Sequence, residues 1–455
     1  MRKMSPSPSG ALPGNSRQMP RLFIIDPSLK DIRGHHYMLT QAATLSAQAH
    51  GFDVTWLCSK EFNNTLQVGG ANVRPTFSSS MYDPYIRARR GTLSSLPHAV
   101  NNILRRKNQP PNEHKDTSFE SDLKEAMQSL GAGPDDRLLL HTGDGQCLPA
   151  ILRILQTMEA AEAPSFHVAT PYDPAGVMPH RTNMAAFSSE LSRLEMRGFL
   201  NRKLFLYAEN SPLAAHLSEL WSVQVGTLPV PAFRQVHGAA AAAASTYRRD
   251  VLQIPSDNLI IASLGSARTE KGFHHIPEII RSVRKMIGES RDPVRKATFV
   301  LQASPQIVGR NKTIRRAIGE LKAMRSSNVK LLLESLSETE YEALLHASEV
   351  ILTPYGEDEY RFRSSGIVTE AIAAGKVLVA SANTYPGAMA KQYGGAAGDG
   401  PDEIAAAIVD VCRNWKEYKE RARERSAKFR DENTVRGYWR ICLDAEAQSA
   451  RMSHA

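Results

Sequence analysis

The feature of the sequence that most constrains its fold is a repeated alternation of short apolar runs with longer segments of helical periodicity. The runs at 22–26, 137–141 and 204–208 consist largely of apolar residues, which is typical of strands buried on both faces of a parallel sheet. A polar loop and a helical pattern follow each run. Strand–helix–strand units of this kind build doubly wound sheets, so the pattern predicts an α/β fold.

This strand–helix alternation occurs twice, on either side of a change in composition. Pro229 and Pro231 precede a Gly and a run of Ala within 237–246, and the strand–helix alternation then resumes. A chain of 455 residues is also too long for one ordinary core. We therefore expect two Rossmann-like doubly wound domains, at 21–232 and 251–430, which face each other across a ligand-binding cleft.

The remaining segments are expected to connect or flank these domains. Residues 233–250 are predicted to be an interdomain linker whose Ala run can form a short helix. Residues 1–20 are rich in Ser, Pro and Gly and lack the apolar run of a secretory signal, which indicates a disordered tail. Residues 431–455 are expected to form a C-terminal helix that can cross back to the first domain.

The composition excludes several classes of protein. No run approaches the roughly 18 to 20 apolar residues of a membrane span. The four cysteines form no CxxC pair, which argues against a disulfide framework or a zinc site and favours a reducing compartment. We therefore expect a cytoplasmic protein, with peripheral contact at the inner face of the cell membrane left open.

The excess of positive charge favours anionic partners. The formal net charge is +9 and the pI is about 9.3. The basic residues of one region indicate either a solvated surface or a patch for anionic lipid or a diphosphate-bearing acceptor: Arg87, Arg89, Arg90, Arg105, Arg106 and Lys107. Nucleic acid is not expected as a partner, because no binding motif is present and no aromatic residues lie between the basic ones.

The loop after the apolar run at 259–264 has the chemistry of a diphosphate site. Gly265 permits a tight turn and a close approach of the backbone to a ligand. Arg268 and Lys271 add two cations just before a predicted helix, whose first N–H groups attract anions. The loop matches neither a Walker A loop nor a GxGxxG fingerprint, which argues against ATPases and dinucleotide oxidoreductases.

A second loop, at 354–365, leads into another predicted helix. Ser364 or Ser365 can cap this helix, and Gly366 lets a ligand approach its free N–H groups. Glu370 lies one turn further on the same face, where its carboxylate can accept two hydrogen bonds from a ribose diol. Both loops follow strands of the same predicted sheet, so we expect them to face the same cleft.

Together these motifs resemble the donor-binding domain of the GT-B glycosyltransferases, specifically the retaining glycosyltransferase family four. The pattern is strand-Gly-(basic loop)-Lys-Gly-helix, followed about a hundred residues later by Ser-Gly-(three residues)-Glu-Ala-(three residues)-Gly. The resemblance implies that Arg268, Lys271, Ser365 and Gly366 bind the donor diphosphate and that Glu370 holds the ribose. It also implies a hexosyltransferase-type reaction with retention of anomeric configuration.

The sequence departs from this family pattern at two positions. The Arg that commonly follows the first Gly of the family is replaced by Ser266, and Arg268 comes two residues later. A second Glu, eight residues before Glu370, is replaced by Phe362. In the family that Glu usually contacts the transferred sugar, so its loss leaves sugar identity open; Glu357, Asp358 or Glu359 could replace it from a shifted loop.

Loops of the first domain are expected to form the acceptor side. Gly34 and His35 follow the first apolar run, Asp144 lies within His141-Thr-Gly-Asp-Gly145, and Asp173 follows the run at 166–170. His141 is the best catalytic candidate, for positioning or proton relay, and Asp144 and Asp173 rank below it. A structural histidine is the competing interpretation of each imidazole.

The predicted reaction is transfer of a sugar from a UDP-, GDP- or other nucleotide diphosphate donor to a saccharide or lipid-linked saccharide, in polysaccharide or lipopolysaccharide biosynthesis. Cations and helix N–H groups can stabilise the leaving diphosphate without a metal, and we find no metal-ligand spacing and expect no cofactor. The alternatives are an inverting transferase or sugar-nucleotide epimerase on the same fold, and a catalytically degenerate protein that acts as a nucleotide-sugar-binding or scaffold protein.

Overall fold

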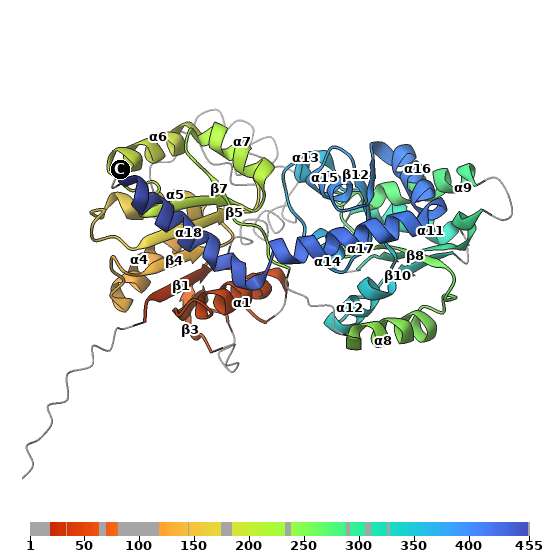
Figure 1. Cartoon of the computed structure of the whole chain (residues 1–455), viewed down its shortest axis with the longest axis horizontal. Helices are drawn as coiled ribbons and strands as arrows, with labels where there is room; N and C mark the ends of the chain where they lie inside the picture. Colours follow the sequence, from red (N-terminus) through yellow and green to blue (C-terminus); the bar gives the residue numbers. More distant parts are fainter. Residues whose placement is uncertain are drawn as a thin grey trace, which may run out of the picture.

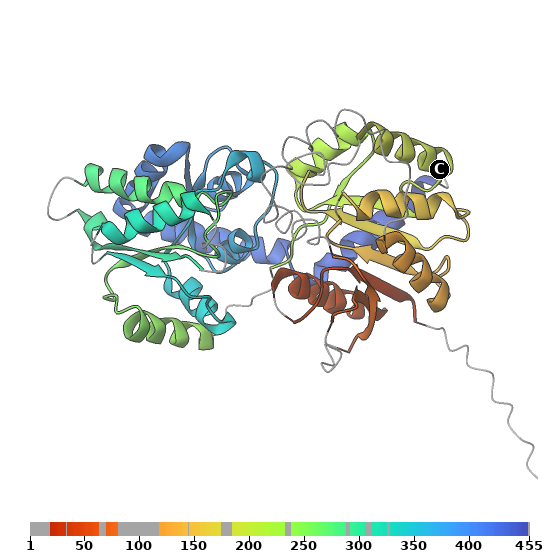
Figure 2. The ribbon, with the colours of Figure 1, turned by 180° about the vertical axis from the view of Figure 1, so that it is seen from behind.

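The computed structural model describes residues 19–32, 34–62, 70–80, 118–143, 145–173, 184–232, 238–287, 292–304, 311–324 and 328–453. Two α/β lobes lie side by side, and the last two helices run from one lobe to the other (Figure 1). The view from behind shows the same two lobes (Figure 2). The tail expected at 1–20 and the basic residues at 87–90 and 105–107 fall largely or wholly outside the described residues.

The first lobe is built on a seven-stranded parallel sheet with the order β3-β2-β1-β4-β5-β6-β7. Its described elements are β1 (Arg21–Asp26), α1 (Gly34–Gln48), β2 (Asp53–Ser59), β3 (Asn72–Phe77), α4 (Ser118–Leu130), β4 (Arg137–Leu140), α5 (Cys147–Gln156), β5 (Ser165–Thr170), α6 (Met184–Met196), β6 (Leu204–Ala208), α7 (Ser211–Trp221) and β7 (Gly226–Thr227).

The second lobe repeats this plan with a six-stranded parallel sheet, in the order β10-β9-β8-β11-β12-β13. Its described elements are α8 (Gly238–Thr246), η1 (Tyr247–Val251), β8 (Leu259–Ser263), η2 (Phe273–His275), α9 (Ile276–Met286), η3 (Pro293–Lys296), β9 (Ala297–Gln302), α11 (Lys312–Ala323), β10 (Val329–Leu332), α12 (Glu338–Ala347), β11 (Val350–Thr353), α13 (Glu357–Tyr360), α14 (Gly366–Ala373), β12 (Val377–Ser381), α15 (Tyr385–Gln392), β13 (Ala396–Gly398) and α16 (Gly400–Arg413).

The continuous apolar runs form strands because both of their faces are covered. In β1, Leu22 and Ile24 pack into one hydrophobic cluster, while Phe23 and Ile25 pack into another on the opposite face. All four are at most 2% exposed. Alternate residues of a strand point to opposite faces of the sheet, so a strand covered by helices on both sides must be apolar at every position. The expected doubly wound α/β architecture is therefore present in both lobes.

Two long helices, one after the other, extend across both lobes. Helix α17 (Trp415–Glu432) lies along the second lobe, and α18 (Val435–Ser453) lies along the first (Figure 1). Trp439 of α18 is fully buried in a first-lobe cluster, and Ser46 Oγ accepts its backbone N–H at 2.8 Å. The N–H of Ala232 donates to Asn433 O at 2.8 Å, so the two chain segments that join the lobes are hydrogen-bonded to each other.

The structure adds detail to the sequence expectations at several places. The Ala run of the expected linker forms α8, the short helix that the sequence allowed because alanine favours helix, and η1 follows it. Ala244 and Tyr247 of these helices are buried in the second lobe. Helix α14 begins at Gly366, directly after Ser365, one of its two expected caps. The pattern also missed elements that are short or only weakly patterned: β3, α4, α6, α15 and β13.

Candidate active site

The donor-side loop after β8 turns sharply at Gly265, which has a φ of +86°. A Cβ atom at this position would lie 2.8 Å from Lys271 Nζ and 3.0 Å from Ile367 Cδ1. Its N–H donates to Gln302 Oε1 at 2.7 Å. The contact with Ile367 shows that the loop after β8 meets α14, so the structure brings together the two loops that the sequence placed in one cleft.

Gly272 brings the same loop against the chain that follows β11. It has a φ of +62°, and a Cβ atom there would lie 1.6 Å from Pro354 O. The N–H of Gly356 donates to Glu270 O at 2.9 Å and holds the two segments together. Strands β8 and β11 are neighbours where the strand order reverses, which is where doubly wound sheets bind ligands.

The two predicted cations of this loop differ in how they are paired. Arg268 Nη1 lies 3.3 Å from Glu270 Oε1, and its Nε donates to Ser266 Oγ at 3.1 Å. Lys271 Nζ instead lies 5.8 Å from the centre of the Tyr355 ring. Burial, followed by the positive charge of Arg268, lowers the pKa of Lys271 to about 7. Such a lysine gains from any anion placed beside it.

The first turn of α14 is free of side-chain capping. Ser365 occupies the N-cap position in an extended conformation but makes no cap hydrogen bond; its Oγ lies 3.4 Å from Tyr355 Oη. Ser364, the other expected cap, donates instead to Glu209 of the first lobe. Gly366 is exposed. An uncapped helix N-terminus with an exposed glycine is well suited to receive a phosphate.

Glu370 lies one turn into α14, as expected. Its Oε2 accepts a hydrogen bond from Tyr341 Oη of α12 at 2.6 Å, and the residue is partly buried. The carboxylate is therefore held in place by a neighbouring helix, and a carboxylate is a hydrogen-bond acceptor at both of its oxygens. The structure places all six donor-side residues named from the sequence around one edge of the second sheet: Gly265, Arg268, Lys271, Ser365, Gly366 and Glu370.

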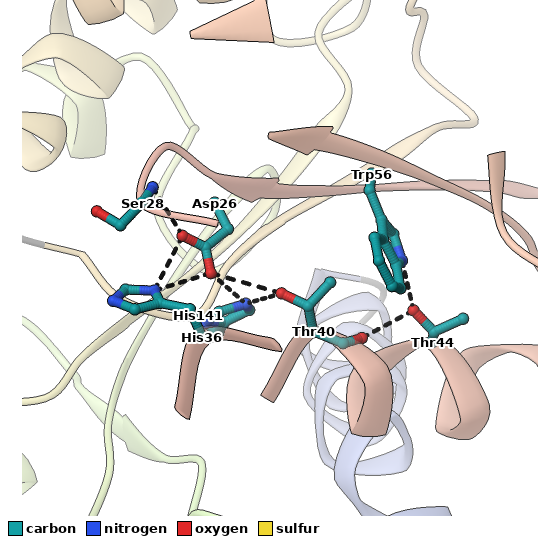
Figure 3. A network of polar contacts seen from close by, with 7 residues as sticks. All are labelled: Asp26, Ser28, His36, Thr40, Thr44, Trp56 and His141. Carbon is teal, nitrogen blue, oxygen red and sulfur yellow. Dashed lines mark hydrogen bonds and ion pairs between the residues drawn. The ribbon is translucent and has the colours of Figure 1, made fainter. Parts of the chain in front are cut away.

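A buried polar network fills the corresponding edge of the first sheet (Figure 3). Asp26, at the end of β1, lies 2.9 Å from His36 Nδ1 and accepts the N–H of Ser28 at 3.0 Å. Burial alone would raise the pKa of Asp26, but the adjacent imidazoles of His36 and His141 and the N–H of Ser28 hold it below its usual value. Asp26 is thus an ionised carboxylate at the core of this edge.

His141, the predicted catalytic histidine, belongs to this network and is 1% exposed. Its Nε2 lies 2.8 Å from Thr40 Oγ1 and 3.5 Å from Asp26 Oδ2 (Figure 3). Burial lowers its pKa to about 4, so the imidazole is neutral at physiological pH. In this conformation His141 is placed to orient Asp26 and His36 rather than to touch a ligand directly. Asp144 lies outside the described residues.

The other acceptor-side residues lie closer to solvent. Gly34, with a φ of +72°, begins α1, and the next residue, His35, is exposed and stacks on His36 at 4.4 Å between ring centres. Asp173 Oδ2 accepts a hydrogen bond from His216 Nε2 at 3.0 Å. His216 in turn stacks on Phe362 of the second lobe. Asp173 therefore lies beside a contact between the lobes.

Several residues of this region were not singled out from the sequence: Asp26, His36, Glu209, Asn210, His216 and Arg363. Asp26 and Glu209 directly follow or end parallel strands, so the rule that selected His141 could have found them. His216 lies within α7 and carries no local sign of function. Only the three-dimensional fold shows that it meets Phe362.

Within the described residues, no group of three or more His, Cys, Asp or Glu side chains is arranged to hold a metal ion. The helices in that same part of the chain include none with the length and apolar character that a membrane span requires. Metal independence and membrane contact both remain predictions.

Comparison with known proteins places this fold among the GT-B structures, as the sequence predicted. No protein-family model and no curated protein matches the sequence. Solved structures match over nearly the whole chain, at identities so low that the likeness concerns the fold. The two facing doubly wound lobes thus have the GT-B architecture.

Three of these structures illustrate the likeness. A UDP-forming α,α-trehalose-phosphate synthase from Burkholderia xenovorans has a TM-score of 0.61 and 14% identity, and the match covers 95% of this chain and 100% of that one. Anabaena HepE in complex with UDP-glucose has a TM-score of 0.58 and 11% identity, with 96% and 100% covered. A glycosyltransferase from Rickettsia africae has a TM-score of 0.60 and 12% identity, with 95% and 99% covered.

Proposed function

We propose that this protein is a glycosyltransferase that moves a sugar from a nucleotide diphosphate donor to a saccharide or lipid-linked saccharide. The observation that carries the proposal is the edge of the second sheet, where Lys271, the uncapped start of α14 and Glu370 converge. A cation and free N–H groups suit a diphosphate, and a carboxylate one helical turn away suits a ribose. The GT-B neighbours, one of them in complex with UDP-glucose, support this assignment.

The proposed chemistry is stabilisation of the leaving diphosphate. As the bond between the sugar and the phosphate oxygen breaks, negative charge grows on that oxygen. Lys271 and the first N–H groups of α14 stabilise this charge more in the transition state than in the ground state. The first-lobe edge, with His35 exposed above the network of Asp26, His36 and His141, is proposed to position the acceptor and the transferred sugar.

Several finer features belong to the same proposal. By its resemblance to family four, the reaction proceeds with retention and without a metal. The acceptor is proposed to be an intermediate of polysaccharide or lipopolysaccharide assembly at the cytoplasmic face of the membrane, since the net charge of +9 favours anionic surfaces. Sedimentation with anionic liposomes tests this location; no binding at low salt counts against it.

The donor assignment is tested by thermal shift with UDP, GDP, ADP, TDP and their sugars, each with and without EDTA. One nucleotide should stabilise the wild type by about 2.7 kcal/mol at a hundred times its Kd. Glu370→Ala should lose this stabilisation. Glu424→Ala, on the exposed side of α17, is the matched control and should retain it. A nucleotide sugar that binds and is then turned over with an acceptor extract completes the case.

Two results would decide against the enzyme. Binding without turnover of any nucleotide sugar would favour the catalytically degenerate alternative, for which Phe362 in place of the family's Glu is the specific reason. If no nucleotide binds the wild type, the assignment of the donor site is wrong. Loss of binding on addition of EDTA would overturn metal independence alone.

A further inference from the structure

The segment between α13 and α14 contacts the first lobe. Asn210 Nδ2 donates to Phe362 O at 2.8 Å, and Ser364 Oγ donates to Glu209. The Phe362 ring stacks on His216 with 4.6 Å between ring centres and 17° between planes. The ring also packs against the main hydrophobic cluster of the first lobe. A second-lobe side chain is thus anchored in the first lobe by both its ring and its backbone.

Anchoring Phe362 fixes the residue that follows it. The Arg363 guanidinium lies 5.4 Å from the centre of the Tyr360 ring, and that ring lies 4.3 Å from the ring of Tyr355. Lys271 Nζ lies on the same Tyr355 ring, at 5.8 Å. Two cations of the donor edge are therefore placed on a pair of touching aromatic rings.

Among the residues that the structure describes, no carboxylate touches either cation, although the charge of Glu270 acts on Lys271 and that of Glu209 on Arg363. Within the described residues, neither Lys271 nor Arg363 forms a hydrogen bond or an ion pair. The two groups also act on each other, because burial and then the charges of Arg268 and Arg363 lower the pKa of Lys271.

The surface of the His35 ring is exposed, but the protein atoms around it still desolvate the ring. This desolvation, then the charges of His36 and His141, and finally that of Arg363 lower the pKa of His35, so Arg363 lies near the first lobe. Like charges that the fold holds together with no anion in direct contact gain from an anion that binds beside them.

We propose that Arg363 is a further anion-binding residue of the donor site, which holds the diphosphate together with Lys271, and that the stack of His216 on Phe362 positions it. This inference rests on the proposed function and adds a residue that the family resemblance did not supply. Guanidinium binds phosphate through paired N–H donors, so Arg363 can fix the orientation of the diphosphate as well as its charge.

The direct test compares Arg363→Gln with Arg361→Gln in the full chain. Arg361 lies two residues away, is exposed, and forms an ion pair with Glu357 of α13, so it is the matched control. Titration calorimetry at low salt measures the Kd of UDP and of inorganic pyrophosphate. Arg363→Gln should weaken both by about tenfold or more. Arg361→Gln should change neither by more than about twofold. Unchanged affinity in Arg363→Gln overturns the proposal.

The positioning role is tested at His216. His216→Ala removes the stack and should weaken pyrophosphate binding several-fold, whereas His216→Phe keeps an aromatic face and should restore it. A merely structural role would lower the Tm of His216→Ala without changing Kd, and that result overturns the positioning claim. Asp173→Asn keeps the partner of His216 similar in shape and should have a smaller effect than His216→Ala.

The outcomes separate this inference from the proposed function. If pyrophosphate binds in an Arg363-dependent way and no nucleotide binds, the anion site stands and the nucleotide donor is wrong. If UDP binding depends on Glu370 and is indifferent to Arg363, the donor site stands and the role of Arg363 is wrong. If the wild type binds neither UDP nor pyrophosphate, both are overturned.

Discussion

The edges of the two sheets that face each other differ in how their charges are satisfied. At the first-lobe edge, the buried carboxylate of Asp26 is surrounded by His36, His141, Thr40 and the N–H of Ser28 (Figure 3). At the second-lobe edge, Lys271 faces an aromatic ring. His141 Nδ1 is buried without a hydrogen-bond partner among the described residues, but the Asp26 carboxylate itself is fully surrounded by polar groups. A carboxylate held in this way keeps its place without a ligand, whereas cations without an anion in contact gain most when an anion binds.

From this comparison we propose that the two lobes have separate roles. In this proposal the second lobe supplies affinity for an anionic ligand, and the first lobe supplies a rigid surface on which a neutral group is oriented. Substitutions in the two edges should therefore affect different measurements: binding of nucleotide on one side, and stability or transfer on the other. The following predictions test this separation, beginning with the largest effect.

The largest effect is expected where the two donor loops touch through the backbone. Gly272→Val would place a Cβ atom 1.6 Å from Pro354 O at a φ of +62°. The clash and the unfavourable backbone conformation should together destabilise the second lobe by more than about 3 kcal/mol and abolish nucleotide binding. Chemical denaturation monitored by circular dichroism measures the change.

The control for this substitution is Gly319→Val in α11, where an added Cβ would have no atom within 4 Å. A valine in a helix differs from glycine by less than about 1 kcal/mol, so stability should change little. If Gly272→Val is as stable as this control, the two loops do not pack as described and the donor edge is not preformed.

The first-lobe network gives the next largest effect. Asp26→Asn removes the negative charge that faces His36 and His141 while preserving shape. An amide is a weaker acceptor than a carboxylate, and a buried hydrogen bond to a charged group contributes about 1.5–3 kcal/mol, so the first lobe should lose stability and transfer activity. UDP affinity of the remaining folded protein should be unchanged, because Asp26 lies in the other lobe. Asp135→Asn, at an exposed position, is the control.

The division between the lobes would fail if Asp26→Asn weakened UDP binding as strongly as a change at Lys271. Thermal denaturation and calorimetry on the same samples distinguish the two effects. If UDP affinity fell equally in Asp26→Asn and in a Lys271 variant, the two sheet edges would act as one binding unit.

The third prediction concerns the pH dependence of nucleotide binding. Burial lowers the pKa of Lys271 to about 7 in the free protein, and a bound diphosphate favours the protonated lysine. Binding should therefore take up a proton, and UDP affinity should fall as pH rises above 7, by up to about tenfold between pH 7 and pH 9. Lys271→Arg stays charged throughout this range and should show a flatter profile. Calorimetry in buffers of different ionisation enthalpy measures the proton uptake directly.

The sequence predicts well those features that depend on residues close together in the chain. Short apolar runs in β1, β4 and β6 indicate strands that are buried on both faces. Local sequence pattern therefore predicts the two sheets and the proposed donor loops at 265–272 and 365–370. The two-lobed arrangement also follows, from the repetition of that pattern, and the motif resemblance predicted that it is GT-B. The proposed role of Lys271 required only its place before a helix.

The features that the sequence did not predict depend on contacts between segments far apart in the chain. Ser364 was a candidate helix cap, yet its hydroxyl donates to Glu209, which lies 155 residues earlier in the chain. Phe362 marked only a missing carboxylate, and its stack on His216 follows from how the lobes meet. His141 was selected as a residue at the end of a strand, but its burial against Thr40 depends on how α1 packs over the sheet.

The smallest effect is expected at Glu209, where the two edges meet. Burial raises the pKa of this carboxyl to about 7, although Ser364 and Arg363 oppose the shift. A carboxyl whose pKa is raised by folding binds more protons when folded, so its contribution to stability is greatest at low pH and declines as pH rises from about 4.5 to 7. Because Glu209 keeps some solvent contact, we expect about 1 kcal/mol, or about 2–4 °C in Tm. Glu209→Gln should remove this decline. Melting curves of both proteins from pH 5 to pH 8 make the comparison, and parallel curves would show that Glu209 stays ionised where the lobes touch.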